Sequence, residues 1–481
     1  MLFGRRYSAR FLVTGPRGPM ALPGLLALVS MLVAWPAAGQ SPIKGARAMA
    51  SSGDSIGDSA AERILVNMKE PALRELLDEV LERNPGVAAA EARARAAAQR
   101  APQVKALPDP VVSLTAFLET PETRTGPQRL SAGIFQGLPW SGKLALKEQA
   151  ALHAAAALEA EVEARRLKLL TEARRLYYEI SFLDRYQEIT EEFLTHLAQH
   201  EEIARARYST GAGSSQGVVK LQAEITRVEN KLLHIETRRV SLAAQLNALR
   251  DRGARAALPV LSSFLSEPAE IRLDPDTLVE AALRFRPEIT AADARIARTG
   301  ALVRLAEKGY RPDFKVGLTY TAVDPRDDTP GRLQPPEGNG HDIFAIQGGI
   351  TLPIWRKKLT AGVEEAIELQ AGAEEVRRDV IAAIEAAIGD LAQRVPLSWR
   401  QLRLVEDLLI VQAQEAAGSA LSGYIAGTLN ALDLLDAEHV LFEARTAAAR
   451  AKTDYLIGLA TLEGAFGGSL QPTTTTERFE S

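Results

Sequence analysis

The sequence contains no cysteine, and this absence excludes several kinds of structure at once. Disulfide bridges, metal sites built on thiolates and a lipid attached to an amino-terminal cysteine all require that residue. Any attachment of the chain to a membrane therefore has to be made in another way.

Aromatic residues are scarce as well, at only 5% of the 481 residues. The chain is rich instead in Ala, Leu, Glu and Arg, a composition that favours long packed helices over compact globular cores. Its formal net charge is -4, so the chain does not have the excess of basic residues that contacts with phosphate groups require. We therefore expect no nucleic-acid partner.

Long hydrophobic runs are almost missing. The clearest one lies near the amino terminus, from about Leu25 to Trp35, and it is too short to cross a bilayer comfortably. Several arginines before it and the small residues of PAAGQ after it are typical of a secretory signal peptide, which we place at residues 1–39. The sequence thus predicts an exported protein and not a helical membrane protein.

Motifs of catalysis are missing too. The stretch GAGSSQG at 211–217 has the glycines of a phosphate-binding loop, but it follows a helix and lacks the Lys-Ser/Thr pair that holds phosphate and magnesium. The Gly-x-Ser-x-Gly pattern occurs at 53–57 and 213–217, in a Ser- and Gly-rich segment and after a helix, whereas a nucleophile elbow follows a strand, and no His-Glu-x-x-His pair occurs. We predict no enzyme and no cofactor.

Helical patterns extend over unusual lengths where Gly and Pro do not interrupt them. Two runs, 142–207 and 358–423, have 66 residues each, or about 99 Å at 1.5 Å per residue. Return helices of about half that length follow at 216–250 and 432–464. Apolar residues in steps of three and four indicate coiled-coil packing along both long runs: Leu169, Ala173, Leu176, Ile180 and Leu183, and Ile381, Ile384, Ile388, Leu391 and Val395.

Two segments with Pro at their second position, 84–100 and 286–309, supply the length that the return helices lack. We expect each to stack end to end with a return helix, beside a long one. Short amphipathic pieces at 70–82 and 275–284, together with a linker at 253–274, are placed around the middle of the rods. The alternative is an irregular helical bundle.

Both ends of the mature chain differ from these helices in composition. Residues 40–69 are rich in Ser, Gly, Ala and Asp, and residues 467–481 in Gly, Ser and Thr. Such segments bury little apolar surface. We predict that both are poorly ordered.

Strands are expected between the helices, because apolar and polar residues alternate there. We place them at about 109–119 and 128–139 in the first half, and at about 313–322 and 342–353 in the second. Their length and one apolar face suit a transmembrane barrel, but four strands cannot close one, since the smallest such barrels use about eight. The chain is therefore expected to oligomerise. The alternative is a small soluble sheet packed on helices.

Similar stretches occur in both halves of the sequence. Tyr208-x-x-Gly211 and Tyr424-x-x-Gly427 are 216 residues apart and open two predicted tips, at about 208–216 and 424–432. The segment LPWSGK at 138–143 has its counterpart in LPIWRKK at 352–358. With these marks the chain resembles the TolC family of outer-membrane efflux ducts.

The resemblance implies a mainly helical fold with a transmembrane β-barrel. In the family, a homotrimer builds one barrel of twelve strands, continued by a long helical coiled-coil tunnel across the periplasm. Two tandem outer membrane efflux repeats are expected at 70–252 and 275–466 around the equatorial linker. The location implied is the outer membrane of a Gram-negative bacterium, in contact with its lipid and with a large periplasmic portion.

Partners are implied by the same resemblance: a periplasmic adaptor and an inner-membrane pump. The form PW-x-GK at 139–143 resembles members that serve heavy-metal pumps of the resistance-nodulation-division type, so the cargo expected is heavy-metal cations or drugs. The alternatives are a duct for type I protein secretion and an exported structural coiled coil without a pore.

Two aspartates in YIAGTLNALDLLDAE, at 424–438, stand out in the second tip. Asn430 can cap the return helix, and Asp433 then lies in its first turn, where a carboxylate gains about 0.3 to 1 kcal/mol. Asp436 lies one turn further, on the same face. The simplest interpretation is therefore that these residues cap the start of a helix.

The family's Gly-Thr-x-x-x-x-Asp-x-x-Asp segment implies more. Gly427 and Thr428 match its start, and Asp433 and Asp436 match its carboxylates. The resemblance implies a periplasmic gate at Asp433, Asp436 and Tyr424, lined by six carboxylates in a trimer. It also implies that the tips dock the adaptor, through Tyr208, Gly211, Gly427 and Thr428.

Two positions depart from the family pattern. Leu429 stands where a basic residue is expected, and Gly217 where an aspartate would face the tyrosine. We therefore expect polar links across the closed tip to be absent and closure to rest on coiled-coil packing. His196 and His200, with Glu192, share one helix face, but such a pair is usually solvated, and no metal site is predicted.

Overall fold

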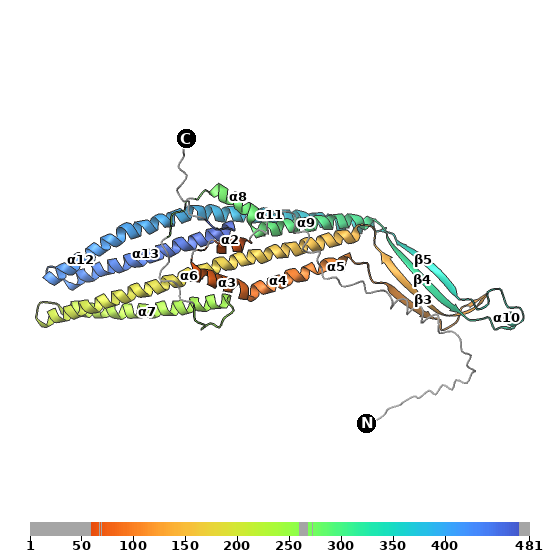
Figure 1. The fold of residues 1–481 in the computed structure, drawn as a ribbon, viewed down its shortest axis with the longest axis horizontal. Helices are drawn as coiled ribbons and strands as arrows, with labels where there is room; N and C mark the ends of the chain where they lie inside the picture. The colour runs from red at the N-terminus through yellow and green to blue at the C-terminus, as the bar shows by residue number, and fades with distance from the viewer. Residues whose placement is uncertain (1–58, 67, 69, 259–267, 272, 471–481) are drawn as a thin grey trace, which may run out of the picture. The chain divides into compact units, whose positions relative to one another are not determined.

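The computed structural model describes residues 59–66, 68, 70–258, 268–271 and 273–470. Its longest helix, α6, runs over Lys143–Ser209 and has 67 residues, or about 100 Å. The second long helix consists of α11, Arg356–Leu404, and α12, Ile410–Ala426, joined by a π-helical turn at Val405–Leu409. Both long helices are confirmed, and Figure 1 shows them running in the same direction from the strands to the tips. The predicted signal peptide lies outside the described residues.

Return helices follow both long helices as predicted, and each meets a second helix end to end. In the first half, the return helix is α7, Ser215–Leu249, and its last residue lies next to Asn84. The Asn84 amide donates to the Leu249 carbonyl at 3.0 Å. The same side chain accepts from the first N–H groups of α4, Pro85–Ala98, which α5, Arg100–Lys105, continues. Asn84 therefore satisfies polar groups at two helix ends at once.

An arginine makes the matching junction in the second half. Helix α13, Ala431–Phe466, ends where α9, Pro287–Glu307, begins, and a 3-10 turn at Lys308–Tyr310 follows α9. The guanidinium of Arg286 donates to the carbonyls of Gly464 and Ala465, both at 2.8 Å. End-to-end stacking of the helices is thus confirmed in both halves (Figure 1).

Short helices cover the middle of the rods. Helix α3, Pro71–Arg83, packs on α6, and α8, Pro275–Phe285, packs on α11 and α13. The predicted seams are buried against the shorter helices beside them, chiefly α3, α7 and α13 for α6, and α8 and α13 for α11, with Ala173, Ile180 and Ile388 fully enclosed. The linker at 253–274 is described only in part.

The predictions for the segments 40–69 and 467–481 need a correction. Residues within 40–69 were expected to be poorly ordered, yet Ala60–Val66 form helix α2, because Ala60, Ala61, Ile64 and Leu65 find buried places against α6 and its neighbours. In the segment 467–481, Gly467 ends α13 and Leu470 packs on the second-half core. Residues 40–58, 67, 69 and 471–481 lie outside the described residues.

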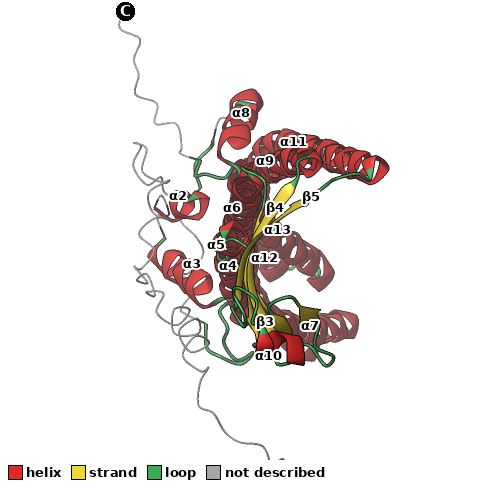
Figure 2. Ribbon diagram, turned by 90° about the vertical axis from the view of Figure 1, so that its right-hand side faces the viewer, coloured by secondary structure: helices red, strands yellow, loops and turns green. Residues whose placement is uncertain are grey.

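The predicted strands form one antiparallel sheet. Strand β1 covers Val111–Ala116, β3 Gly126–Leu138, β4 Asp313–Val323 and β5 Ile343–Thr351. They follow one another in the order β1-β3-β4-β5, and a short strand missed in the sequence, β2 at Glu122–Thr123, pairs with β3. A short helix also missed, α10 at Thr329–Leu333, lies in the loop between β4 and β5. Figure 2 shows the sheet as a curved strip.

The sheet exposes much of its apolar surface. All six residues of β1 and all nine of β5 are exposed, including Val112, Leu114, Phe344 and Ile346. Among the described residues, no helix is both long and apolar enough for a membrane crossing.

Candidate functional site

The two tips lie at the far end of the long helices from the sheet, and each turns on a glycine. Gly211, after α6, has a φ of 77°, and Gly427, after α12, has a φ of 79°. Both angles lie in the left-handed region. This conformation is unfavourable for a residue that has a Cβ atom and is not unfavourable for glycine. The predicted tip glycines therefore have a backbone reason to be glycine.

Thr428 completes the second turn. Its backbone N–H and its hydroxyl both donate to the carbonyl of Gly423, at 2.9 and 3.0 Å. These bonds, with one from the Gly427 N–H, satisfy a carbonyl in the last turn of the helix. The Gly-Thr pair predicted from the sequence thus closes helix α12.

Asp433 has the capping role that the simplest interpretation predicted. The Asn430 side chain accepts from the N–H groups of Leu432 and Asp433, and the Asp433 carboxylate accepts from the Asn430 N–H at 3.1 Å. This is a reciprocal capping box at the start of α13. One turn on, the Asp436 side chain makes no hydrogen bond or ion pair with any described residue, and both aspartates are exposed.

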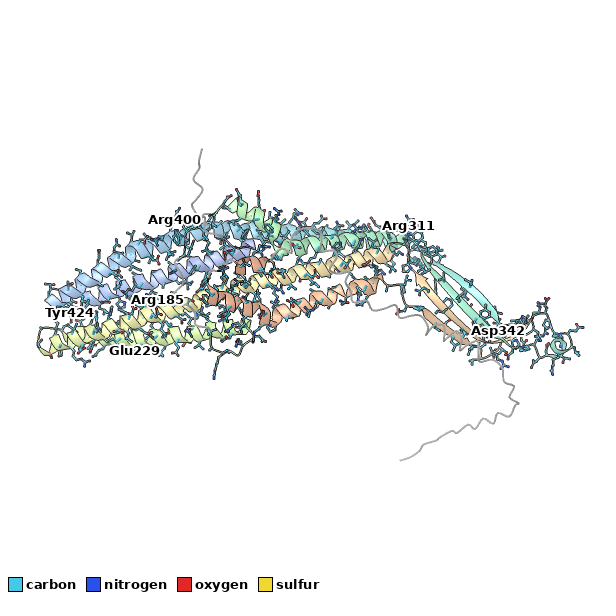
Figure 3. All side chains as sticks on the ribbon, viewed as in Figure 1. Arg185, Glu229, Arg311, Asp342, Arg400 and Tyr424 are labelled. Carbon is cyan, nitrogen blue, oxygen red and sulfur yellow. The ribbon has the colours of Figure 1, made fainter. Side chains whose placement is uncertain are left out.

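Tyr424 is packed inside the tip. Its side chain is only 4% exposed and lies in a cluster with Ala420 and Leu434, between α12 and α13. Figure 3 labels Tyr424 near the end of α12. Tyr208, at the matching sequence position of the first tip, is 53% exposed. The two tyrosines therefore differ in environment although their motifs agree.

Arg207 joins the two tips of the chain. Its guanidinium donates to the backbone carbonyl of Tyr424, and the guanidinium carbon lies 5.0 Å from the centre of the Tyr424 ring. Such stacking contributes about 0.5 to 1 kcal/mol at exposed sites and more where water is excluded. Burial raises the pKa of the Tyr424 hydroxyl, and the positive charge of Arg207 partly offsets that rise.

The expectation that polar links across the tip are absent is therefore wrong within one chain. As predicted, Leu429 and Gly217 supply no polar link. Arg207, which directly precedes Tyr208, supplies one instead. The signal available in the sequence was a basic residue in the last turn of the long helix, a position where the helix dipole favours one.

Leu429 and Gly217 instead allow close packing. A Cβ atom at Gly423 would lie 2.9 Å from the Cγ atom of Leu429, so this leucine folds back over a glycine of its own helix end. A Cβ atom at Gly217 would lie 3.0 Å from that of Ala431, so the starts of α7 and α13 approach each other there. The departures from the family pattern thus replace polar groups by contacts of small and apolar ones.

The histidines of α6 pair with a carboxylate that sequence reasoning missed. His196 Nδ1 and His200 Nε2 lie 3.2 and 3.1 Å from the two oxygens of Glu438 on α13. Glu192, considered as their partner, binds Arg445 at 2.8 Å instead. Within the described ranges no cluster of three or more His, Cys, Asp or Glu is placed to hold a metal ion.

Lowering the pH is expected to weaken this contact between α6 and α13. Burial alone would raise the pKa of Glu438, but hydrogen bonds from His200 and His196 outweigh it and hold that pKa below its usual value. The Glu438 contribution is then fully present above the unfolded value, about 4.3, and is lost as the pH falls through the lower folded value. Thermal melting of wild type and Glu438→Gln between pH 7 and 3 measures it.

The substituted protein should lose less stability on acidification than the wild type, because the titrating carboxyl is gone. Glu443→Gln, at an exposed site on the same helix, serves as the control and should follow the wild type. Parallel pH profiles for Glu438→Gln and wild type would show that the His–Glu contact carries no pH-dependent stability.

Comparison with known proteins agrees with this geometry. The family of outer membrane efflux proteins matches residues 76–250 and 278–468. The outer membrane protein TolC of Vibrio cholerae is 23% identical over 411 residues, which cover 82% of this chain and 90% of that protein. The pyoverdine export outer membrane protein OpmQ of Pseudomonas putida is 24% identical over 334 residues, which cover 63% and 66%.

Solved structures share the fold. The outer membrane protein VceC from Vibrio cholerae has a TM-score of 0.68 and 23% identity, with 86% of this chain and 100% of that chain covered. CusC has a TM-score of 0.70 and 18% identity, with 86% and 96% covered. The open state of the MtrE outer membrane channel of Neisseria gonorrhoeae has a TM-score of 0.66 and 20% identity, with 84% and 91% covered.

Proposed function

Because the chain belongs to the family of outer membrane efflux proteins, we propose that it is the passive outer-membrane duct of a three-part export system. Three copies build one barrel in the outer membrane, and their helices continue it as a tunnel into the periplasm. The duct has no active site and consumes no ATP. Export is driven by an inner-membrane pump that reaches the duct through a periplasmic adaptor.

The sheet carries most of this proposal. Its outer strands, β1 and β5, have no further strand beside them within the described chain, and both are exposed and partly apolar. In lipid, each unpaired backbone group costs several kcal/mol, so a sheet with two open edges cannot remain in the membrane alone. Closure with further copies of the chain removes both edges.

The gate is proposed at the second tip. Asp433 and Asp436 are exposed on α13, and in a trimer they supply six carboxylates at the periplasmic opening. The Arg207 contact with Tyr424 and the packing of Gly217 on Ala431 support a closed tip, because they join the first and second tips.

The cargo is proposed to be small, either heavy-metal cations or drugs. The PW-x-GK segment at 139–143 supports this, as does the similarity to a protein named for the export of pyoverdine. An inner-membrane pump of the resistance-nodulation-division type is the matching partner. The genes that neighbour the gene for this chain test this choice of partner. Genes for such a pump and for an adaptor are expected there, whereas a gene for an ATP-binding exporter would favour protein secretion.

Membrane fractionation tests the proposal. A tagged chain should be extracted from outer membranes only by detergent and as a trimer, and it should restore export to a strain whose own duct has been deleted. Recovery as a water-soluble periplasmic protein that restores nothing would contradict the duct and favour an exported coiled coil without a pore.

Replacing Gly427 by Val is expected to weaken adaptor binding before it affects the trimer. The positive φ of Gly427 is costly for Val, by about 1 kcal/mol or more, and the tip turn should distort locally. Co-purification of the adaptor with the duct measures the effect. Gly418→Val is the control, because a Cβ atom there meets nothing within 4 Å. Loss of the trimer with unchanged adaptor binding would remove the tip from the docking site.

A further inference from the structure

A lysine and an aspartate hold the first strand-to-helix junction together. Lys143, the first residue of α6, donates to the Asp313 carboxylate at 2.7 Å and to the Arg311 carbonyl at 3.0 Å. The Trp140 N–H donates to the same carboxylate at 2.7 Å, and the Trp140 ring stacks on Phe314 at 5.8 Å. The end of β3 is thereby joined to the start of β4, in the region where Figure 3 labels Arg311.

The two strand pairs of the chain have the same register. Asp109, in Leu-Pro-Asp, lies 204 positions before Asp313, in Arg-Pro-Asp, and Leu138-Pro139 lies 214 positions before Leu352-Pro353. Under these two shifts the observed pair Val111 with Phe135 becomes Lys315 with Gly349, which is also an observed pair. The same holds for Val112 with Ile134, which becomes Val316 with Gly348.

The shifts identify counterparts of the junction residues. Lys357, the second residue of α11, corresponds to Lys143, and Asp109 corresponds to Asp313. Both Lys357 and Asp109 are exposed, and neither has an ion-pair partner in the part of the chain that the structure describes. They belong to opposite edges of the sheet, beside β5 and β1, with β3 and β4 between them. The two residues of one chain therefore cannot repeat the first junction.

We infer that Lys357 of one copy binds Asp109 of the next copy, and that β5 pairs there with β1 in a defined register. This inference rests on the oligomeric duct proposed above. Gly137 pairs with Lys315 and Gly133 with Thr319 within one copy. Moving the first residue of each pair forward by 214 positions and the second back by 204 sets Thr351 opposite Val111 of the next copy and Gln347 opposite Thr115. The contact between copies then repeats the contact within the copy.

Charge and position support the pairing. The pair Lys143 and Asp313 shows that a lysine at the start of a long helix reaches the carboxylate at the start of the neighbouring strand. A charge-assisted hydrogen bond of this kind fixes the ends of two strands, and a shift by one residue would turn every side chain to the opposite face of the sheet. The pair Lys357 and Asp109 thus sets which residues of two copies meet.

Cysteine cross-linking tests the register, since the natural chain has no cysteine. Four double variants combine Thr351→Cys or Gln347→Cys with Val111→Cys or Thr115→Cys. A disulfide needs Cα atoms about 4.4 to 6.8 Å apart, and a displacement by four residues is about 13 Å. We expect bonded dimers and trimers from Thr351 with Val111 and from Gln347 with Thr115, and none from the two crossed combinations.

Charge reversal tests the ion pair. Asp109→Lys and Lys357→Asp should each reduce the trimer that survives mild heating in dodecyl sulfate, and the double variant should regain it, because the opposite charges are restored. Lys358→Asp, at the next residue, is the matched control and should leave the trimer unchanged. Failure of the double variant to recover would overturn the ion pair.

The outcomes separate this inference from the function beneath it. Trimers that cross-link only in the crossed combinations, or equally in all four, would overturn the register and leave the duct standing. A wild-type chain that forms no oligomer in outer membranes would overturn the duct, and the pairing between copies with it.

Discussion

Replacing Asp433 and Asp436 together by Asn is expected to weaken strongly the block of the channel by multivalent cations. The change removes six negative charges from the proposed opening of a trimer. Asn at position 433 retains an oxygen that can accept from the Asn430 N–H, so the helix cap at the start of α13 is largely preserved. Barrel insertion should be unaffected, because neither residue belongs to the sheet.

The size of the effect follows from electrostatics. At about 10 Å in water, a trivalent cation gains roughly 1 kcal/mol from each carboxylate, and salt at about 0.1 M reduces this to roughly a third. Six carboxylates then contribute about 2 kcal/mol, so the affinity for a hexammine-type trivalent ion should fall roughly thirty-fold. Titration of the ion against single-channel current measures it.

A control removes the same number of charges elsewhere. Asp379→Asn with Asp390→Asn, both exposed on α11, should leave the block unchanged, because these residues lie far along the chain from the tip. If the block persists without Asp433 and Asp436 while the trimer loses stability, these residues are helix caps only and the gate lies elsewhere.

Removing the carboxylate of Glu463 is expected to be the most destabilising single change in the helical region. Glu463 on α13 lies 2.6 Å from the guanidinium of Arg174 on α6, and both side chains are buried. The same carboxylate accepts from the Leu470 N–H at 2.9 Å. Breaking a buried ion pair on one side leaves a charge without compensation, at a cost of about 3 to 5 kcal/mol.

Glu463→Gln should therefore lower the melting temperature clearly, as followed by circular dichroism in detergent. The double variant Glu463→Gln with Arg174→Met is the informative partner, because it removes the buried charge as well and should recover much of the loss. Arg175→Met, a neighbouring partly exposed arginine, is the control. A small effect of Glu463→Gln would mean that water reaches this pair in the assembled protein.

Much of the fold could be predicted because local signals decide it. The ends of α6 and α12 follow from glycines with positive φ, and the strands follow from alternation of apolar and polar residues. Stacking of α7 on α4 could be inferred from helix lengths, although the Asn84 bond that makes the junction could not. The capping box of Asn430 and Asp433 was likewise contained in a short stretch of sequence.

The missed features depend on contacts between distant residues. The π-helical turn at Val405–Leu409 adds a residue to one helical turn, and the packing of neighbouring helices decides where such a turn is tolerated. Helix α2 forms because α6 and its neighbours bury its apolar side. The contacts of Arg207 with Tyr424 and of Glu438 with the histidines join residues more than 200 positions apart, so no local pattern contains them.

Single-channel recording in a planar bilayer tests the central claim most directly. The purified wild-type trimer should insert and give small, uniform, cation-selective current steps, which multivalent cations block when added on the side of the tips. A trimer that inserts and conducts nothing under any condition, or a chain that never enters the bilayer, would contradict the account of this protein as an export duct.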